Sequence, residues 1–115
     1  MLQSVKAPGP PHTPDGRYFV AIGKAGPRLW RATNPNLDPD TRAQLVRALM
    51  AARRAVRDAR GDAEKIRTAR AAVHAAKLAL GESGSVWWSD GAPDLNRRLV
   101  EGSPYADWWA QLSNG

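Results

Sequence analysis

Two long segments in the middle of the chain repeat apolar residues at the spacing of an α-helix. In the first segment, residues 39–60, these positions are Leu45, Leu49, Ala52 and Val56. In the second, residues 63–80, they are Ile66, Ala69, Val73, Ala76 and Leu80. At about 100° per residue each set falls on one side of its helix, so the two sides are expected to pack together.

The residues that flank these segments predict where the helices begin and end. Asp38 is a favourable N-cap, and Pro39 suits the first helical position because its missing N–H would be unpaired there. Gly61 predicts the end of the first helix, and Asp62 and Gly81 bound the second. Because the link between the helices is short, they are expected to form an antiparallel αα-hairpin.

Two β-like segments precede the helices. Residues 17–22 are rich in aromatic and β-branched side chains, and residues 28–31 alternate polar and apolar side chains at the start of a second segment, 28–33. Residues 23–27 contain two glycines, and a connector of this length suits a β-hairpin. The pattern therefore predicts a hairpin of two strands.

The last third of the chain predicts two short helices and a cover for the rest of the fold. Pro93 could start a helix that ends near Glu101, and Ser103 with Pro104 could cap another that runs to about Leu112. Four of the five tryptophans lie in this part. The expected fold is α+β: an N-terminal β-hairpin packed on an antiparallel αα-hairpin, with a Trp-rich C-terminal segment of short helices. Residues 17–115 would form a single small domain behind a disordered, Pro-rich tail of residues 1–16.

Composition limits the classes of function. The chain has no cysteine, so disulfides, thiolate metal sites and a cysteine nucleophile are excluded. It shows no apolar run near the ~20 residues of a membrane span and no apolar core of a secretory signal, so we expect a cytoplasmic protein without a membrane partner. The net charge is +6, and residues 38–81 hold ten bases against five acids. This excess favours an anionic partner.

Arginines supply most of the positive charge and are the first candidate for function. Thirteen arginines stand against four lysines, and a guanidinium group matches the geometry of a phosphate. We expect a non-enzymatic protein that binds DNA or RNA through an arginine-rich helical face, with Trp30 as a stacking side chain. The predicted contacts are Arg28, Trp30, Arg31, Arg53, Arg54, Arg57 and Arg70. The alternative is a solvated surface whose charges contact nothing.

The segment of residues 86–97 is the second candidate. It contains Trp87, Trp88, Asp90, Asp94 and Asn96. The tryptophans could cover the core or form a surface for a protein partner. The acids and the amide could hold a divalent cation in a small metal-dependent hydrolase, or they could form an Asx turn and a helix cap.

No residue pattern in the chain predicts a catalytic site, a bound metal or a cofactor. His12 and His74 have no partner at the spacing of metal ligands or of a catalytic triad. Gly-rich phosphate loops, the GxSxG motif and the HExxH motif are all absent from the sequence. The sequence leaves the oligomeric state open.

Three motifs stand out along the chain: RLWRATNP at residues 28–35, VWWSDGAPDLNR at residues 86–97 and PYADWW at residues 104–109. Together they resemble a family of short bacterial proteins without an assigned activity, some of which carry the label "biopolymer transporter Tol". The resemblance covers about residues 15–112, and the tryptophan motif is its specific part. The label reflects Ala-rich charged helices like those of Tol proteins, and the resemblance implies no activity and no site residue.

Overall fold

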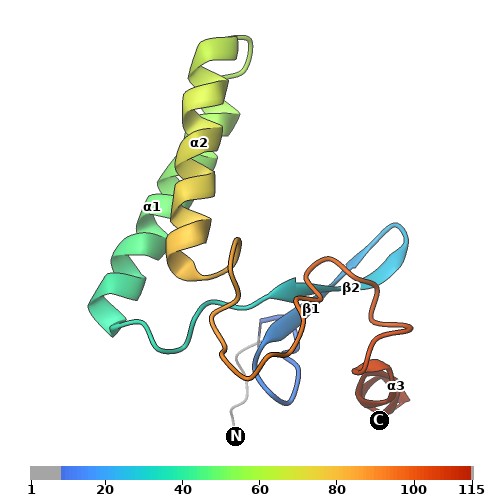
Figure 1. The fold of residues 1–115 in the computed structure, drawn as a ribbon. Helices are drawn as coiled ribbons and strands as arrows, with labels where there is room; N and C mark the ends of the chain where they lie inside the picture. Colours follow the sequence, from blue (N-terminus) through green and yellow to red (C-terminus); the bar gives the residue numbers. More distant parts are fainter. Residues whose placement is uncertain (1–8, 115) are drawn as a thin grey trace, which may run out of the picture. The chain divides into compact units, whose positions relative to one another are not determined.

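The computed structural model describes residues 9–114, which divide into two compact units. The strand unit comprises residues up to 32 and from 93 onward, and the helical unit comprises residues 33–92. The elements follow one another as a β-hairpin, two packed helices and a short C-terminal helix (Figure 1). The arrangement is therefore α+β, as predicted.

The strand unit is built on an antiparallel pair of strands, β1 (Tyr18–Gly23) and β2 (Gly26–Arg31). The predicted hairpin is confirmed, but the turn contains only two residues, Lys24 and Ala25, because both strands extend into the glycines that we assigned to the connector. Gly26 has a φ of 117°, which an L side chain rarely adopts.

Both edges of the hairpin are covered by irregular chain. On the outer side of β1, the amide of Val20 donates to Pro11 O at 2.9 Å, and the amide of Thr13 donates to Tyr18 O at 2.8 Å. On the outer side of β2, the amide of Leu29 donates to Arg98 O at 2.8 Å and the amide of Val100 donates to Pro27 O at 2.9 Å. Backbone groups at sheet edges need such partners, and these segments supply them.

The first of these edge segments lies inside the tail that we expected to be disordered, residues 1–16. Residues 1–8 lie outside the described residues, whereas Thr13 is buried and its hydroxyl hydrogen-bonds Asp15 and the backbone of Tyr18. Residues 11–16 thus differ from the expected tail because their backbone groups find partners on β1 despite the prolines.

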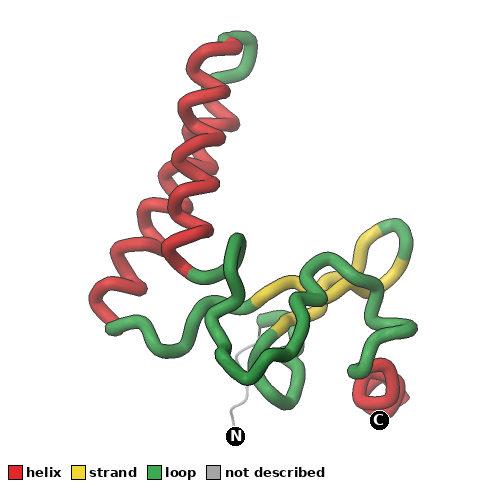
Figure 2. The backbone as a smooth tube through the Cα atoms, viewed as in Figure 1, coloured by secondary structure: helices red, strands yellow, loops and turns green. Residues whose placement is uncertain are grey.

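The second edge segment corrects the prediction of a helix over residues 93–101. These residues form an extended loop beside β2, with an isolated bridge between Arg28 and Leu99 (Figure 2). Arg97 has a φ of 76°, which is incompatible with a right-handed helix. Three backbone hydrogen bonds join this segment to β2, and the one within it, from the amide of Arg98 to Leu95 O at 3.0 Å, closes a turn rather than a helix.

One helix of the expected C-terminal pair is present. It is α3 (Ala106–Asn114), and the hydroxyl of Ser103 accepts a hydrogen bond at 3.1 Å from the amide of Tyr105 just before it. The ring of Tyr105 packs edge-on against Tyr18 of β1, with 5.7 Å between ring centroids. The core of the strand unit includes Tyr18, Val20, Leu29 and Val100, each at most 3% exposed.

The helical unit is the predicted αα-hairpin, formed by α1 (Pro39–Asp58) and α2 (Ala63–Leu80). The carboxylate of Asp38 accepts from the amide of Thr41, and that of Asp62 accepts from the amide of Lys65, so both N-caps are confirmed. Gly81 ends α2 with a φ of 80°. At the open end of the hairpin, Leu49 of α1 packs with Ala76 and Leu80 of α2. Leu45 and Val46 from the first half of α1 pack against the same cluster, so the first half of one helix meets the end of the other and the pair is antiparallel.

Candidate nucleic-acid interface

The two helices of the helical unit carry a set of basic side chains on the same side of the hairpin. The positions of these side chains can be given as angles around each helix axis, measured from the buried side of the helix. The angles are about 70° to 120° in the same rotational sense for Arg53 and Arg57 of α1 and for Arg70 and His74 of α2. Because the helices are antiparallel, equal displacement in one sense brings both sets to one side. We call these four residues the arginine face.

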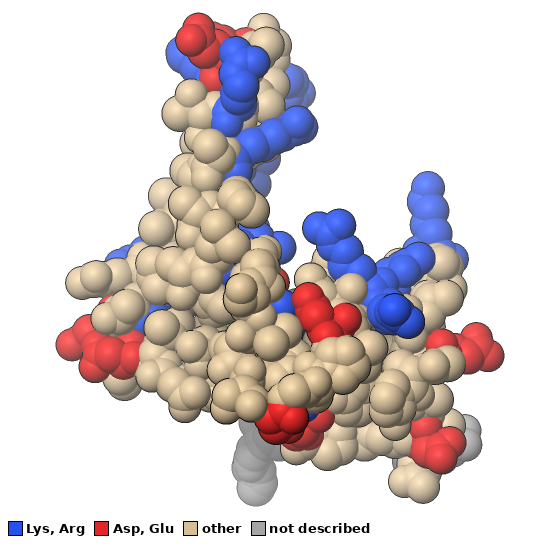
Figure 3. Space-filling model, viewed as in Figure 1, with Lys and Arg blue, Asp and Glu red and all other residues tan. Residues whose placement is uncertain are grey.

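The opposite side of the hairpin is lined by alanine. A groove of about 790 Å³ runs between the helices there, and its lining includes Ala52, Ala55, Ala59, Ala69 and Ala72. These positions are displaced from the buried centre in the opposite sense to the arginines. In Figure 3 the middle of the hairpin is blue along its right-hand flank and mostly tan along its left-hand flank, in agreement with two unlike faces.

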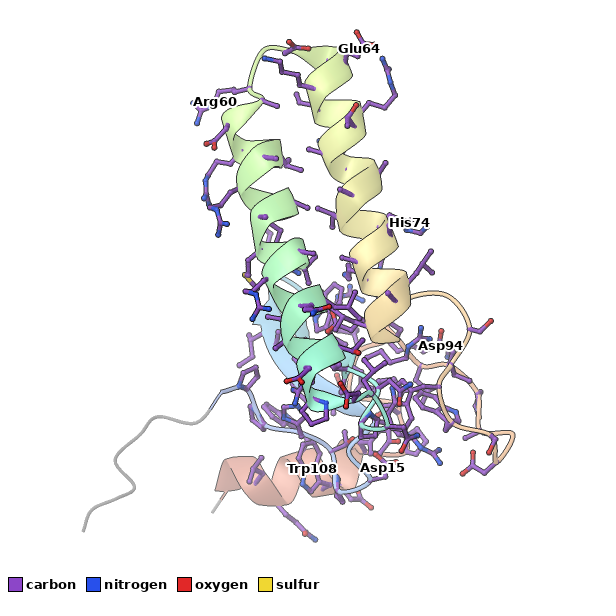
Figure 4. The ribbon with its side chains drawn as sticks, turned by 90° about the vertical axis from the view of Figure 1, so that its left-hand side faces the viewer. Asp15, Arg60, Glu64, His74, Asp94 and Trp108 are labelled. Carbon is purple, nitrogen blue, oxygen red and sulfur yellow. The ribbon has the colours of Figure 1, made fainter. Side chains whose placement is uncertain are left out.

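The side chains of the arginine face are free to meet an external partner. Arg53, Arg57, Arg70 and His74 are all exposed. Across the described part of the chain, residues 9–114, none of the four forms an ion pair or a side-chain hydrogen bond. Figure 4 shows the side chain of His74 extending outward from α2, on the side away from α1. The positive charge of this face is therefore not neutralised within the helical unit.

Arg54 does not share the direction of the other predicted contacts on α1. It lies roughly opposite the buried side of the helix, as does Arg47, and both are exposed. The predicted contacts on α1, Arg53, Arg54 and Arg57, therefore spread more widely around the helix than the arginine face does. Arg47 and Arg54 provide a natural comparison for Arg53 and Arg70.

The predicted contacts Arg28 and Trp30 lie on β2, in the strand unit. Both are half-buried, and an Nη1–H of Arg28 donates to Arg97 O at 2.7 Å. Trp30 pairs with Phe19 across the hairpin, and the guanidinium carbon of Arg97 lies 5.9 Å from the centroid of a Trp30 ring. The charged group beside the Trp30 ring is therefore Arg97.

Arg31 is not available to a phosphate. Its side chain is buried, and its Nη1 forms an ion pair with Asp94 Oδ2 at 3.0 Å. The alternation of β2 explains the difference from Arg28, because Tyr18, Leu29 and Arg31 face the core side of the sheet while Arg28 and Trp30 face the other side. Arg31 is therefore a structural residue, and we remove it from the predicted contacts.

The acids and the amide of the 86–97 segment form local and structural contacts. Asp90 Oδ1 accepts from the amide of Ala92 at 3.0 Å, which is the expected Asx turn. Asp94 holds Arg31, and Asn96 Oδ1 accepts from the amide of Arg31 at 2.9 Å. No group of three or more His, Asp or Glu side chains that could hold a metal ion occurs among the described residues. The contacts thus favour the structural interpretation of this segment over a metal-dependent hydrolase.

The tryptophans of the segment pack within the helical unit. Trp87 and Trp88 are half-buried and meet edge to face, with 5.1 Å between ring centroids. The indole Nε1–H of Trp88 donates to Ala92 O at 2.8 Å, and Trp87 lies beside Gly81 at the end of α2. These contacts fit a cover over the open end of the helical hairpin.

Residues that sequence reasoning missed lie around Trp30. Phe19 faces the same side of the sheet, and Arg97 reaches it from the edge segment. A signal for Phe19 was present, because its strand position pairs with that of Trp30 once the turn is set at two residues. No local signal pointed to Arg97, since its position was assigned to a helix.

A carboxylate elsewhere in the strand unit predicts a pH dependence of stability. Partial burial raises the pKa of Asp15, but hydrogen bonds from Tyr105, from Thr13 and from the backbone of Arg17 outweigh it, so this pKa lies below its usual value of 3.8. A lowered pKa stabilises the fold above that value, and the stabilisation is lost as the pH falls through the pKa of the folded state. In Asp15→Asn the free energy of unfolding should therefore fall less as the pH is lowered. We call this fall on acidification the acid limb, and urea unfolding between about pH 2 and 6 measures it.

The control for this prediction is Glu101→Gln, which removes an exposed carboxylate from the same unit. It should leave the acid limb unchanged. An unaltered limb in Asp15→Asn would show that the hydrogen bond between Tyr105 Oη and Asp15 Oδ2, 2.6 Å long, adds no pH-dependent stability.

The described helices and the comparisons with other proteins give no direct guide to function. None of the helices within residues 9–114 has the length and hydropathy that crossing a bilayer requires. Protein-family models, curated proteins and solved structures were compared with the chain, and no match was found.

Proposed function

We propose that this protein is a non-enzymatic nucleic-acid-binding protein whose helical unit contacts the phosphate backbone through the arginine face. The observation that carries the proposal is the position of Arg53, Arg57 and Arg70 on one side of the antiparallel hairpin, exposed and without an ion-pair partner among the described residues. An arginine that is already paired would lose that pair on binding, whereas these side chains would not.

The chemistry of the face fits phosphate. Guanidinium groups bind phosphate oxygens through paired N–H donors, and each contact releases counterions from the nucleic acid. Arg53 and Arg57 are four residues apart, which places them one turn apart on the same helix. Two helices that present arginines side by side can follow a backbone whose charges are closely spaced. The net charge of +6 supports association with any polyanion.

Binding should weaken steeply with salt and depend on the face rather than on net charge alone. We expect Arg53→Glu combined with Arg70→Glu to reduce the affinity for a labelled oligonucleotide at least about tenfold at ~0.1 M salt. The same variant should also show a shallower salt dependence, with the magnitude of the slope of log K against log salt reduced by about 2. Fluorescence anisotropy over a salt series measures both quantities.

The matched control is Arg47→Glu combined with Arg54→Glu, which makes the same change in net charge on the outward side of α1. We expect this variant to lose less than about threefold in affinity. Equal losses in the two variants would assign binding to overall charge and reject the arginine face. Absence of any salt-dependent binding by the native protein would reject nucleic-acid binding itself.

A further inference from the structure

A row of aromatic and basic side chains crosses one face of the sheet in the strand unit. His12 forms a bridge with Phe19 of β1, Phe19 pairs with Trp30 of β2, and Arg97 approaches the Trp30 ring from the edge segment. We call His12, Phe19, Trp30 and Arg97 the aromatic row. The row joins the N-terminal edge segment and both strands of the hairpin to Arg97, which lies much later in the sequence.

The distances place the members of the row in contact or close to it. The ring centroids of His12 and Phe19 lie 6.0 Å apart with an angle of 45° between the planes. Phe19 and Trp30 are directly opposed in the antiparallel register, so their Cβ atoms are about 5 Å apart. The guanidinium carbon of Arg97 is 5.9 Å from the Trp30 centroid, within the range of a cation–π interaction.

The two faces of the sheet differ in what covers them. On the core side, Tyr18 packs against Tyr105, and Arg31 binds Asp94. On the other side, Phe19 and Trp30 keep part of their surface open, and Ala21, two positions after Phe19 on the same face of β1, is exposed. Large aromatic side chains that remain half-exposed on a sheet are available to planar partners.

Arg97 is held toward the row by an unusual backbone conformation. Its φ of 76° lies in the left-handed region that favours glycine, and no other described non-glycine residue has a positive φ. Its amide donates to Leu29 O at 2.6 Å, and its carbonyl accepts from Arg28 Nη1 at 2.7 Å. Two hydrogen bonds to its backbone therefore fix this arginine beside Trp30, in a conformation that is unfavourable for a residue other than glycine.

We propose that the aromatic row is a stacking platform for the unpaired bases of a single-stranded nucleic acid. Bases stack on exposed aromatic rings largely without regard to sequence, and a nearby arginine adds cation–π attraction and a contact for the backbone. Aromatic side chains on the open face of a small sheet are a recurrent means of holding single-stranded RNA. A duplex keeps its bases stacked inside and cannot use the row. This inference rests on the proposed function and names its preferred substrate as single-stranded.

The test replaces Trp30 with a leucine, which keeps an apolar side chain but removes the ring, and with a phenylalanine, which keeps a ring. The probes are a labelled oligothymidine of about 15 nucleotides and a duplex of the same length. A single strand of this length offers at least as many nucleotides as one small domain usually covers. Anisotropy gives the affinities, and thermal unfolding verifies that each variant folds. Arg97→Asn is a second variant, since asparagine tolerates a positive φ and lacks the guanidinium.

We expect the native protein to bind the single strand more tightly than the duplex. Trp30→Leu should weaken single-strand binding about tenfold and leave duplex binding almost unchanged, while Trp30→Phe should retain most of the affinity. Arg97→Asn should weaken single-strand binding in the same direction even if Trp30→Leu fails to fold.

Two results would overturn the inference in distinguishable ways. If Trp30→Leu and Arg97→Asn bind the single strand as the native protein does, while Arg53→Glu combined with Arg70→Glu is impaired, the arginine face stands and the row is only a cross-strand packing cluster. If the native protein binds neither probe at low salt, the proposed function fails, and the inference fails with it.

Discussion

Replacing Asp94 with alanine is expected to lower the free energy of unfolding by about 3 kcal/mol, because it leaves the guanidinium of Arg31 buried without its carboxylate. The side chain of Arg31 is 0% exposed, whereas that of Asp94 is 43% exposed. The cost therefore arises mainly from the arginine, whose buried guanidinium cannot exchange the lost carboxylate for water. The partial exposure of Asp94 places the effect at the lower end of the range for buried pairs. Urea unfolding followed by tryptophan fluorescence measures the change.

A second substitution separates loss of the ion pair from loss of packing. Arg31→Met combined with Asp94→Ala removes both charges and keeps an unbranched apolar side chain in the core. We expect this double variant to be at least about 1 kcal/mol more stable than Asp94→Ala alone, since a buried charge that has lost an ion-pair partner costs more than no charge. A double variant less stable than Asp94→Ala would show that contacts of Arg31 other than Asp94 dominate.

Glu101→Ala is the control in the same unit, because it removes an exposed carboxylate. Loss of this side chain should change the free energy of unfolding by only about 0.5 kcal/mol. Equal losses in Asp94→Ala and Glu101→Ala would show that the ion pair between Arg31 and Asp94 adds no particular stability.

The helices could be predicted because their signals are local. Asp38, Asp62 and Gly81 act through the backbone of residues that directly follow or precede them, and each was assigned correctly. The common side of Arg53 and Arg70 also follows from sequence periodicity once the helices are antiparallel.

The error over residues 93–101 has a different physical origin. Pro93 and the residues after it can start a helix as far as local preference is concerned. Their backbone instead bonds β2, about 70 residues earlier in the chain, and Asp94 and Asn96 bind Arg31 there. Tertiary contacts of this kind override weak helix preferences and leave no periodic trace in the sequence. Arg31 was assigned to the nucleic-acid contacts for the same reason, since its partner lay in a segment with the wrong predicted structure.

Gly81 is the position where an added methyl group should do most harm in the helical unit. It ends α2 with a φ of 80°, and a Cβ atom built there would lie 2.9 Å from Asn34 Cβ and 3.2 Å from Trp87 Cδ1. Asn34 is held in place because its amide donates to Leu80 O at 2.8 Å. The methyl group would therefore press on a backbone-anchored residue and on the tryptophan cover at once.

We expect Gly81→Ala to lower the free energy of unfolding by about 2–3 kcal/mol, through the left-handed backbone and the overlap together. Gly61→Ala is the matched control, because Gly61 follows α1 with a φ of 86° and nothing lies within 4 Å of its added Cβ. That variant should cost only about 1 kcal/mol, the backbone term alone. Urea unfolding gives both values, and their difference isolates the packing of Trp87 and Asn34 around the end of α2. Equal values would mean that Asn34 and Trp87 yield without cost, and that the tryptophan cover is loosely attached to the helical hairpin.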